Sequence, residues 1–286
     1  MWPIKIMCAV LNVSTSGYYD SRASEPSARA ARHDQIKHEV QQVYDEHHGI
    51  YGSWKIADVM QQRADLESAC RNTVASAMRE LGLKSKVCKA FKPTTTQADP
   101  SKRPAENVLQ QDFAADRPNE KWVTDITYIA TDAGWVYLAA VMDCFSRKIV
   151  GWSLHESLAT ALVSDALQHA IEQRRPNIVD EGLLHHSDRG CQYTSDVYQH
   201  TLKTLGITCS MSRTGCCYDN ATIERFFWSL KHEWSNHQSH ANLAAARSSI
   251  FQYIELFYNR KRIHQALSYM TPEQYETVHA AQTNVA

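Results

Sequence analysis

Three acidic side chains in this 286-residue sequence occupy positions from which they could act together. Asp125 falls in the middle of a β-branched and aromatic run, where an aspartate is unfavourable and needs a reason. Asp188 directly follows a short apolar run, at a strand end of the kind where open α/β sheets place their sites. Glu224 lies at the margin of an amphipathic helical segment, with 35 residues between it and Asp188. Each one alone also fits an ordinary strand-end, turn or surface residue.

Together the three carboxylates indicate metal-dependent chemistry on phosphate esters. A strand, a strand end and a helix would supply hard oxygen ligands for two Mg²⁺ ions about 3.5–4 Å apart, as used for in-line phosphoryl displacement. The chain between Asp188 and Glu224 holds a helix, a strand and a loop, which can return it to the same sheet edge. Asp143 and Asp219 are weaker candidates, because Asp143 ends a predicted strand and Asp219 is placed to cap a helix. The sequence therefore predicts a two-Mg²⁺ site, with Mn²⁺ as a substitute.

The elements that position these residues form a predicted α/β domain with a mixed five-stranded sheet. Strands are predicted at 121–130, 135–144, 147–155, 182–186 and 207–211, and helices at 158–173, 195–205 and from about 219 onward. Three antiparallel strands in succession, then alternating helices and strands, indicate the mixed sheet. On the last helix, Asn220, Glu224 and Lys231 share one stripe. The apolar stripe beside it consists of Ile223, Phe226, Phe227, Leu230 and Trp234.

The region before this domain is predicted to be a helical DNA-binding module. Residues 1–30 suggest a short apolar helix, a Ser/Gly-containing turn and a linker from Ser21 onward. Helices are predicted from about 31 to 48, 51–60 and 72–82, and the last two resemble a helix-turn-helix. A recognition helix presents its N-terminal polar side chains to base edges, which indicates Arg71, Asn72 and Thr73. A three-helix packing module without DNA contact is the alternative.

Charge is distributed unevenly along the chain. The net charge is -1, but eight Lys and Arg stand against two acidic residues from Arg71 to Arg103, which is a local footprint for nucleic acid. From Asn119 onward 14 basic residues face 17 acidic ones, a balance that a bound divalent metal would partly offset. None of the eight cysteines forms a Cys-x-x-Cys pair, which argues against a zinc module. No apolar run of membrane-spanning length and no signal-peptide pattern is present, which predicts a cytoplasmic protein.

These observations divide the chain into five predicted parts. An N-terminal helical segment at 1–30 is followed by the helix-turn-helix module at 31–90 and a basic, proline-containing linker at 91–118. The catalytic core is predicted at 119–236, and a C-terminal helical extension at 237–286. The linker is expected to become ordered on DNA.

Several motifs resemble one known family along nearly the whole chain. They include Val123–Asp125, His186–Ser195, Ser212–Glu224 and Tyr258–His264. These segments resemble the DDE transposases of the bacterial insertion sequence 3 family, whose catalytic core is similar to that of retroviral integrases. The resemblance implies a ribonuclease-H-like core preceded by a helix-turn-helix. Cys216 and Ile223 replace residues more usual in the family, but neither is a ligand position.

The resemblance also implies a reaction and its partners. Such an enzyme nicks the ends of its element with water and joins the freed 3′-hydroxyl to another phosphodiester. Asp125 would bridge both metals, Asp188 and Glu224 would each complete one, and Lys231 would contact the terminal DNA near the scissile phosphate. Double-stranded DNA from element ends and target is the expected partner, bound by a homo-oligomer at the nucleoid without a membrane. Further expected DNA contacts are Lys84, Lys86, Arg213, Asn220 and Arg260.

Two other functions remain open at this stage. Family members usually work as a fusion whose upstream part supplies another helix-turn-helix and a coiled coil, and no such segment precedes Met1. A downstream product or a shortened copy would be a DNA-binding regulator of transposition that cannot recombine. A structure-specific nuclease on the same core would cleave DNA but never join it.

Overall fold

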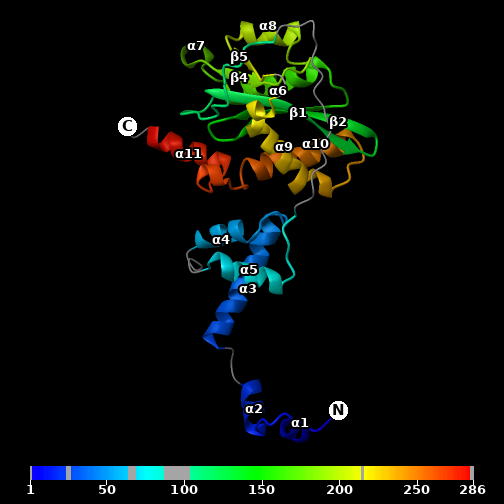
Figure 1. The fold of residues 1–286 in the computed structure, drawn as a ribbon, viewed down its shortest axis with the longest axis vertical. Helices are drawn as coiled ribbons and strands as arrows, with labels where there is room; N and C mark the ends of the chain where they lie inside the picture. The colour runs from blue at the N-terminus through cyan, green and yellow to red at the C-terminus, as the bar shows by residue number, and fades with distance from the viewer. Residues whose placement is uncertain (1, 24–26, 64–68, 87–103, 214–215, 284–286) are drawn as a thin grey trace. The chain divides into compact units, whose positions relative to one another are not determined.

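The computed structural model of the protein describes residues 2–23, 27–63, 69–86, 104–213 and 216–283. The chain divides into two compact units, Met1–Ser85 and Lys86–Ala286, which Figure 1 shows as a helical unit and a unit built on a sheet. No helix in the described part of the chain combines the length and apolar character that crossing a bilayer requires.

The first unit is helical, and three of its helices share an apolar core. Its helices are α1 (Ile4–Val10), α2 (Thr15–Ala23), α3 (Ala28–Glu46), α4 (Ser53–Gln61) and α5 (Arg71–Glu80). Helices α3, α4 and α5 contact one another pairwise, and Val40, Ile56 and Val74 on them are completely buried. Ser27 caps α3 by accepting a hydrogen bond from the amide of Ala30 at 3.2 Å.

Two sequence-based expectations for this unit are wrong. Helix α2 occupies part of the predicted turn and linker, because the Ser14 hydroxyl accepts a hydrogen bond from the amide of Gly17 (2.9 Å) and so starts a helix where the composition indicated a turn. The last of this unit's predicted helices, 72–82, ends at Glu80 instead, so Leu81 lies just beyond α5 and is 37% exposed.

The second unit is built on one five-stranded sheet. Its strands are β1 (Lys121–Thr131), β2 (Gly134–Asp143), β3 (Ile149–His155), β4 (Leu184–Ser187) and β5 (Thr208–Met211). They lie in the order β3-β2-β1-β4-β5. The first three strands pair antiparallel, while β4 is parallel to β1 and β5 is parallel to β4. This confirms the predicted mixed sheet, and it places β1, which holds Asp125, directly beside β4, which precedes Asp188.

Helices surround the sheet. They are α6 (Thr160–Arg174), α7 (Ile178–Glu181), α8 (Asp196–Thr204), η1 (Cys217–Asn220), α9 (Ala221–Glu233), η2 (Ser235–His237), α10 (Leu243–Phe251), η3 (Gln252–Tyr258), η4 (Gln265–Leu267) and α11 (Pro272–Thr283). Helix α6 packs on β2 and β3, and α9 packs on β1. Of these, η3 is a π-helix that directly continues α10.

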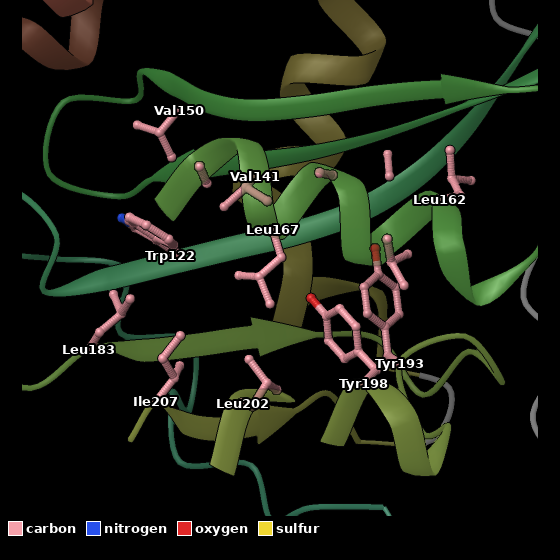
Figure 2. Packing of buried hydrophobic residues seen from close by; sticks show 14 of the residues in the cluster. Trp122, Val141, Val150, Leu162, Leu167, Leu183, Tyr193, Tyr198, Leu202 and Ile207 are labelled. Atoms are coloured by element: carbon pink, nitrogen blue, oxygen red, sulfur yellow. The ribbon is translucent and has the colours of Figure 1, made fainter. Parts of the chain in front are cut away.

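The main core lies between the sheet and helices α6 and α8 (Figure 2). Trp122 of β1, Leu167 of α6 and Leu202 of α8 are buried there. Helix α6 approaches β3 closely at Gly151, where a Cβ atom would lie 2.3 Å from the carbonyl oxygen of Ala166. A glycine at this point is therefore required by the packing of α6 on the sheet.

The C-terminal residues pack tightly on the rest of the second unit. The Asn259 side chain accepts a hydrogen bond from the amide of Ile149 and donates one to its carbonyl, both at 3.0 Å, so it binds the edge strand β3 like another strand residue. Glu276 of α11 accepts hydrogen bonds from Arg174 (2.9 Å) and Ser146 (2.7 Å). Residues on both sides of position 236 thus belong to one folded unit.

The described half of the predicted linker also packs on this unit. Leu109 is buried, and the amides of Val108 and Leu109 both donate hydrogen bonds to the hydroxyl of Ser210 on β5, each at 3.0 Å. Residues 87–103 lie outside the described residues; they are the end of the predicted helix-turn-helix module, with Lys89, and the first part of the predicted linker, with Lys92.

Candidate active site

Asp125 occupies the middle of β1, half-buried and paired across the sheet with Ala140. Its carboxylate accepts a hydrogen bond from the amide of Ile126 at 2.8 Å. Burial raises the pKa of Asp125 well above its ordinary value, and the negative charges of Asp188 and Glu224 raise it further. Asp125, although an unfavourable residue for a strand, therefore interacts electrostatically with both other candidate carboxylates.

The other two carboxylates reach Asp125 from a strand end and a helix start. Asp188 directly follows β4, and its Oδ1 atom accepts a hydrogen bond from the amide of Gly190 at 2.9 Å. Glu224 is in the first turn of α9, and burial together with the charge of Asp188 raises its pKa. Each of the three is thus close enough to influence another electrostatically, as expected for a cluster of like charges.

The chemistry of this donor set fits a hard divalent cation. Asp188 raises the pKa of both Asp125 and Glu224, and a cation bound among the three carboxylates would relieve this repulsion; Mg²⁺ prefers such oxygen ligands. As the side chains stand, no group of three Asp, Glu, His or Cys residues in the described ranges is close enough to hold a metal ion. The donors fit in kind, and binding would require the three side chains to move closer together.

Lys231 provides a positive charge beside this cluster. It lies on α9, where burial lowers its pKa to about 8 while the charge of Asp125 acts in the opposite direction. Its ammonium group stands 3.8 Å from the ring centroid of Tyr128, a cation–π contact. Trp135 packs edge-on against Tyr128. Neither aromatic residue was among the predicted site residues, because the contact of Lys231 with Tyr128 joins two separate elements.

Asn220 ties the start of α9 to β1. Its side-chain amide donates a hydrogen bond to the carbonyl oxygen of Thr124, next to Asp125, at 3.1 Å. Asn220 is buried, and within the described residues its Oδ1 atom has no hydrogen-bond partner. A buried acceptor without a partner is costly, so this oxygen is suited to receive a hydrogen bond from a bound molecule.

Asp219 is not the helix cap that the sequence predicts. Helix α9 begins at Ala221, its N-cap residue is Asn220, and no side chain caps it. Asp219 is instead completely buried, and its carboxylate accepts hydrogen bonds from the backbone and guanidinium of Arg213. The predicted cap was wrong because Arg213, together with the side chains of Asn107 and Gln111, outcompetes the amides of the helix for this carboxylate.

Arg213 and Asp143, two more residues from the sequence analysis, take part in ion pairs. The Arg213 side chain is 60% exposed and lies 3.1 Å from Asp219. Asp143 is completely buried, and it pairs with Arg174 at 3.0 Å and accepts hydrogen bonds from the amides of Asn119 and Phe145. Asp143 therefore has a local structural role at the end of β2, in agreement with the sequence analysis.

The remaining predicted DNA contacts lie mostly at the surface. Arg71 and Asn72 are exposed in the first turn of α5, and the Arg71 guanidinium stacks 4.4 Å above the ring of Trp54. Thr73 is half-buried beside them. Arg260, in the second unit, is 57% exposed at its side chain and 3.7 Å from Glu273. Lys84 and Lys86 follow α5 and are exposed.

Comparison with known proteins identifies the family. Residues 115–217 and 205–272 match models of the integrase core domain, and residues 31–91 match an HTH-like domain. The chain is 40% identical over 281 residues to the transposase InsF for insertion sequence IS3A of Escherichia coli strain K12, covering 97% of this chain and 95% of that protein. The chain belongs to the insertion sequence 3 transposase family.

Other relatives agree with this membership. An uncharacterized 31 kDa protein of insertion element IS600 from Shigella sonnei is 37% identical over 269 residues, which cover 94% of this chain and 97% of that protein. Among solved structures, the HTLV-2 integrase catalytic core domain in complex with magnesium is similar at 17% identity and a TM-score of 0.44, covering 57% of this chain and 99% of that one. The predicted ribonuclease-H-like class, with an HTH-like domain before it, is confirmed by the family models and the mixed sheet.

Proposed function

We propose that the chain is a Mg²⁺-dependent transposase that nicks DNA at the ends of its element and joins the freed 3′-hydroxyl to another phosphodiester. The observation that supports this most is the electrostatic cluster of Asp125, Asp188 and Glu224, contributed by a strand, a strand end and a helix. Membership of a transposase family with an integrase core supplies the reaction class.

In this proposal Asp125, Asp188 and Glu224 would hold two metal ions. Bound metal would supply activation of the nucleophile, which is water for nicking and the 3′-hydroxyl for joining, and stabilisation of the leaving oxygen without a protein base. The protein keeps Asp125 oriented through its hydrogen bond from Ile126, and Asp188 through its bond from Gly190.

Neighbouring side chains would position the DNA. The ammonium of Lys231 interacts electrostatically with Asp125. It is therefore placed to contact a phosphate next to the reacting phosphate. The unpartnered Oδ1 atom of Asn220 can accept a hydrogen bond from a nucleotide at the start of α9. Lysine contacts of this kind neutralise backbone charge, whereas an amide oxygen can distinguish groups on a base.

The first unit, together with Lys86 directly after it, would recognise element ends. Arg71, Asn72 and Thr73 stand in the first turn of α5, from which a recognition helix reaches base edges, and Lys84 and Lys86 would contact phosphates. Arg213 and Arg260 are the further proposed phosphate contacts. We propose a homo-oligomer on double-stranded DNA as the working form, at the bacterial nucleoid, with Mn²⁺ able to replace Mg²⁺.

A strand-transfer assay tests the proposal. Labelled duplex carrying a candidate element end is incubated with a target plasmid and Mg²⁺, using wild type, Glu224→Gln and the exposed control Glu156→Gln. We expect wild type and the control to join label to plasmid, and Glu224→Gln to bind the DNA but lose at least 99% of joining. A wild type that binds DNA as tightly as Glu224→Gln and, like it, joins none would indicate a regulator. A wild type that cleaves DNA without joining it would indicate a nuclease. Either result overturns the proposal.

A further inference from the structure

One buried carboxylate beside the candidate site has no part in the chemistry described so far. Asp219 is completely buried in the loop between β5 and α9. Its Oδ2 atom accepts hydrogen bonds from the Asn107 side chain and the Arg213 amide, both at 2.8 Å, and its Oδ1 atom accepts one from Gln111 at 2.8 Å. The carboxylate thus joins the segment before β1 to the loop that leads into α9.

Charged and sulfur donors complete the environment of Asp219. The Arg213 guanidinium donates from Nε to Oδ2 at 3.2 Å and from Nη2 to Oδ1 at 3.1 Å, and the Cys216 thiol donates to Oδ1 at 3.2 Å. These donors hold the pKa of Asp219 well below its ordinary value. Both oxygens of this carboxylate are therefore engaged by protein donors, so Asp219 is a structural anion and not a further metal ligand.

The start of the same loop is tied to the neighbours of Asp188. The amide of Ser212 donates a hydrogen bond to the carbonyl of Ser187 at 2.9 Å, and the carbonyl of Ser212 accepts one from the Arg189 side chain at 2.6 Å. Ser187 and Arg189 flank Asp188 in the sequence. Ser212, the first residue after β5, is thus fixed to the backbone on both sides of Asp188.

The end of the loop is tied to the neighbour of Asp125. Asn220 follows Asp219 directly and donates its hydrogen bond to the carbonyl of Thr124, at 3.1 Å. Glu224 comes four residues later, which is about one helical turn. Any freedom in the loop at Asp219 would therefore move Glu224 relative to the other two carboxylates.

We propose that Asp219 is a positioning residue. By binding Arg213, Asn107 and Gln111 it fixes the residues that lead into α9, and so sets the place of Glu224 against Asp125 and Asp188. The inference rests on the proposed metal-dependent function for its consequence, but the hydrogen bonds of Asp219 are independent of it. Loss of the anion leaves the Arg213 charge without its partner, and the first turn of α9 is held less firmly. The metal ligands are then assembled less often.

Two variants distinguish positioning from general stability. Asp219→Asn keeps the size of the side chain and removes its charge. Asp143→Asn does the same at another completely buried, arginine-paired carboxylate of the same unit, away from the loop. The readouts are hydrogen exchange of amides 221–224, measured without metal, and the Mg²⁺ concentration that gives half-maximal strand transfer. We expect Asp219→Asn to raise the exchange rate of these amides and the required Mg²⁺ concentration at least tenfold each. Asp143→Asn should lower thermal stability but change neither the exchange rate nor the Mg²⁺ requirement.

The outcomes separate this inference from the proposed function. Unchanged exchange in Asp219→Asn, or an unchanged Mg²⁺ requirement in an active Asp219→Asn, overturns the positioning role, as does an equal effect of Asp143→Asn. If the wild type never joins DNA, the proposed function fails and hydrogen exchange alone decides about Asp219. Should Asp219→Asn fail to fold, Gln111→Ala removes one donor from an exposed side chain and must show the same two changes, at least threefold.

Discussion

At the level of single residues, Asp125 lowers the stability of the metal-free fold but is needed for the proposed chemistry. Burial and the charges of Asp188 and Glu224 raise its pKa in the folded protein. A carboxyl group with a raised folded pKa binds a proton more tightly folded than unfolded, so ionising it as the pH rises lowers the free energy of unfolding. At neutral pH and without metal, Asp125 is therefore a cost to the fold, as often found at active sites.

Replacing Asp125 should therefore stabilise the metal-free protein. In Asp125→Asn the hydrogen bond from Ile126 is retained and the charge is removed. We expect the free energy of unfolding at pH 7 to rise, because the buried charge and its repulsion by Asp188 and Glu224 are both removed. Urea unfolding in the presence of a chelator measures it.

The exposed Asp180→Asn serves as the control, with an expected change within about 0.5 kcal/mol. A clear loss of stability in Asp125→Asn would show that the carboxylate is stabilised where it stands, which the proposed like-charge cluster does not allow.

Lys231 should make DNA binding dependent on pH. Its folded pKa of about 8 lies below the ordinary 10.5, so the ammonium is mostly present at pH 7 and reduced to roughly a tenth at pH 9. If it contacts a phosphate, the affinity for end DNA falls over this range by up to about tenfold, as fluorescence anisotropy can measure.

Lys231→Arg keeps its charge throughout this range and should bind with little dependence on pH. An equal fall in Lys231→Arg, or constant affinity of the wild type, would contradict the assignment of the ammonium to the DNA.

At the level of elements, a buried ion pair fixes the far end of α9. Glu233, the last residue of the helix, accepts hydrogen bonds from Arg262 at 2.7 Å and 2.6 Å and one from Tyr253 at 3.2 Å. The side chains of Glu233 and Arg262 are each only 10% exposed. The C-terminal residues thereby hold the helix that presents Glu224.

Removing one partner of this pair should be strongly destabilising. We expect Arg262→Ala to cost about 3–5 kcal/mol, because it leaves Glu233 buried and uncompensated. Arg260→Ala, two residues away in an exposed pair with Glu273, should cost less than about 1 kcal/mol. Urea unfolding followed by circular dichroism compares them. Equal effects of the two substitutions would mean that α9 does not depend on this anchor.

The strands and main helices could be predicted from sequence because local patterns determine them. Alternation and β-branched residues located β1 within one residue of its observed end, and the apolar stripe from Ile223 to Trp234 located α9. The same patterns placed Asp188 immediately after β4. Position on an element is a local property, so the three carboxylates could be chosen before any contact was known.

Features that depend on distant partners could not be predicted in this way. Asp219 was taken for a cap because its donors Asn107 and Gln111 lie more than 100 residues away in the sequence. The pairing of Glu233 with Arg262 and the contact of Lys231 with Tyr128 arise likewise from the packing of separate elements. No periodicity in the sequence encodes such contacts.

At the level of the whole molecule, charge is divided between the parts of the chain. Eight Lys and Arg against two acidic residues between Arg71 and Arg103 contrast with 14 basic and 17 acidic residues from Asn119 onward. Electrostatic affinity for DNA is therefore expected to reside mainly in the first unit and the segment after it, and chemistry in the second.

Substitutions in the first unit, and at Lys86 directly after it, should separate affinity from specificity. Lys84→Ala and Lys86→Ala should weaken binding to end and random DNA equally and each lower the slope of log affinity against log salt by about one. Asn72→Ala should lose about 1–3 kcal/mol for the end sequence only. Anisotropy titrations at several salt concentrations test both. A lysine substitution that weakens binding to end DNA and random DNA unequally would contradict the assigned phosphate contact. An Asn72→Ala substitution that weakens binding to both DNAs equally would contradict the assigned base contact.

The most direct test of the central claim is metal binding at the carboxylate cluster. Electron paramagnetic resonance of Mn²⁺ reports the free ion, and so the affinity, for wild type, Asp125→Asn, Asp188→Asn, Glu224→Gln and the buried control Asp143→Asn. We predict that wild type and Asp143→Asn bind Mn²⁺ alike, and that each of the other three substitutions weakens binding at least tenfold. Undiminished binding in those three variants would contradict the account.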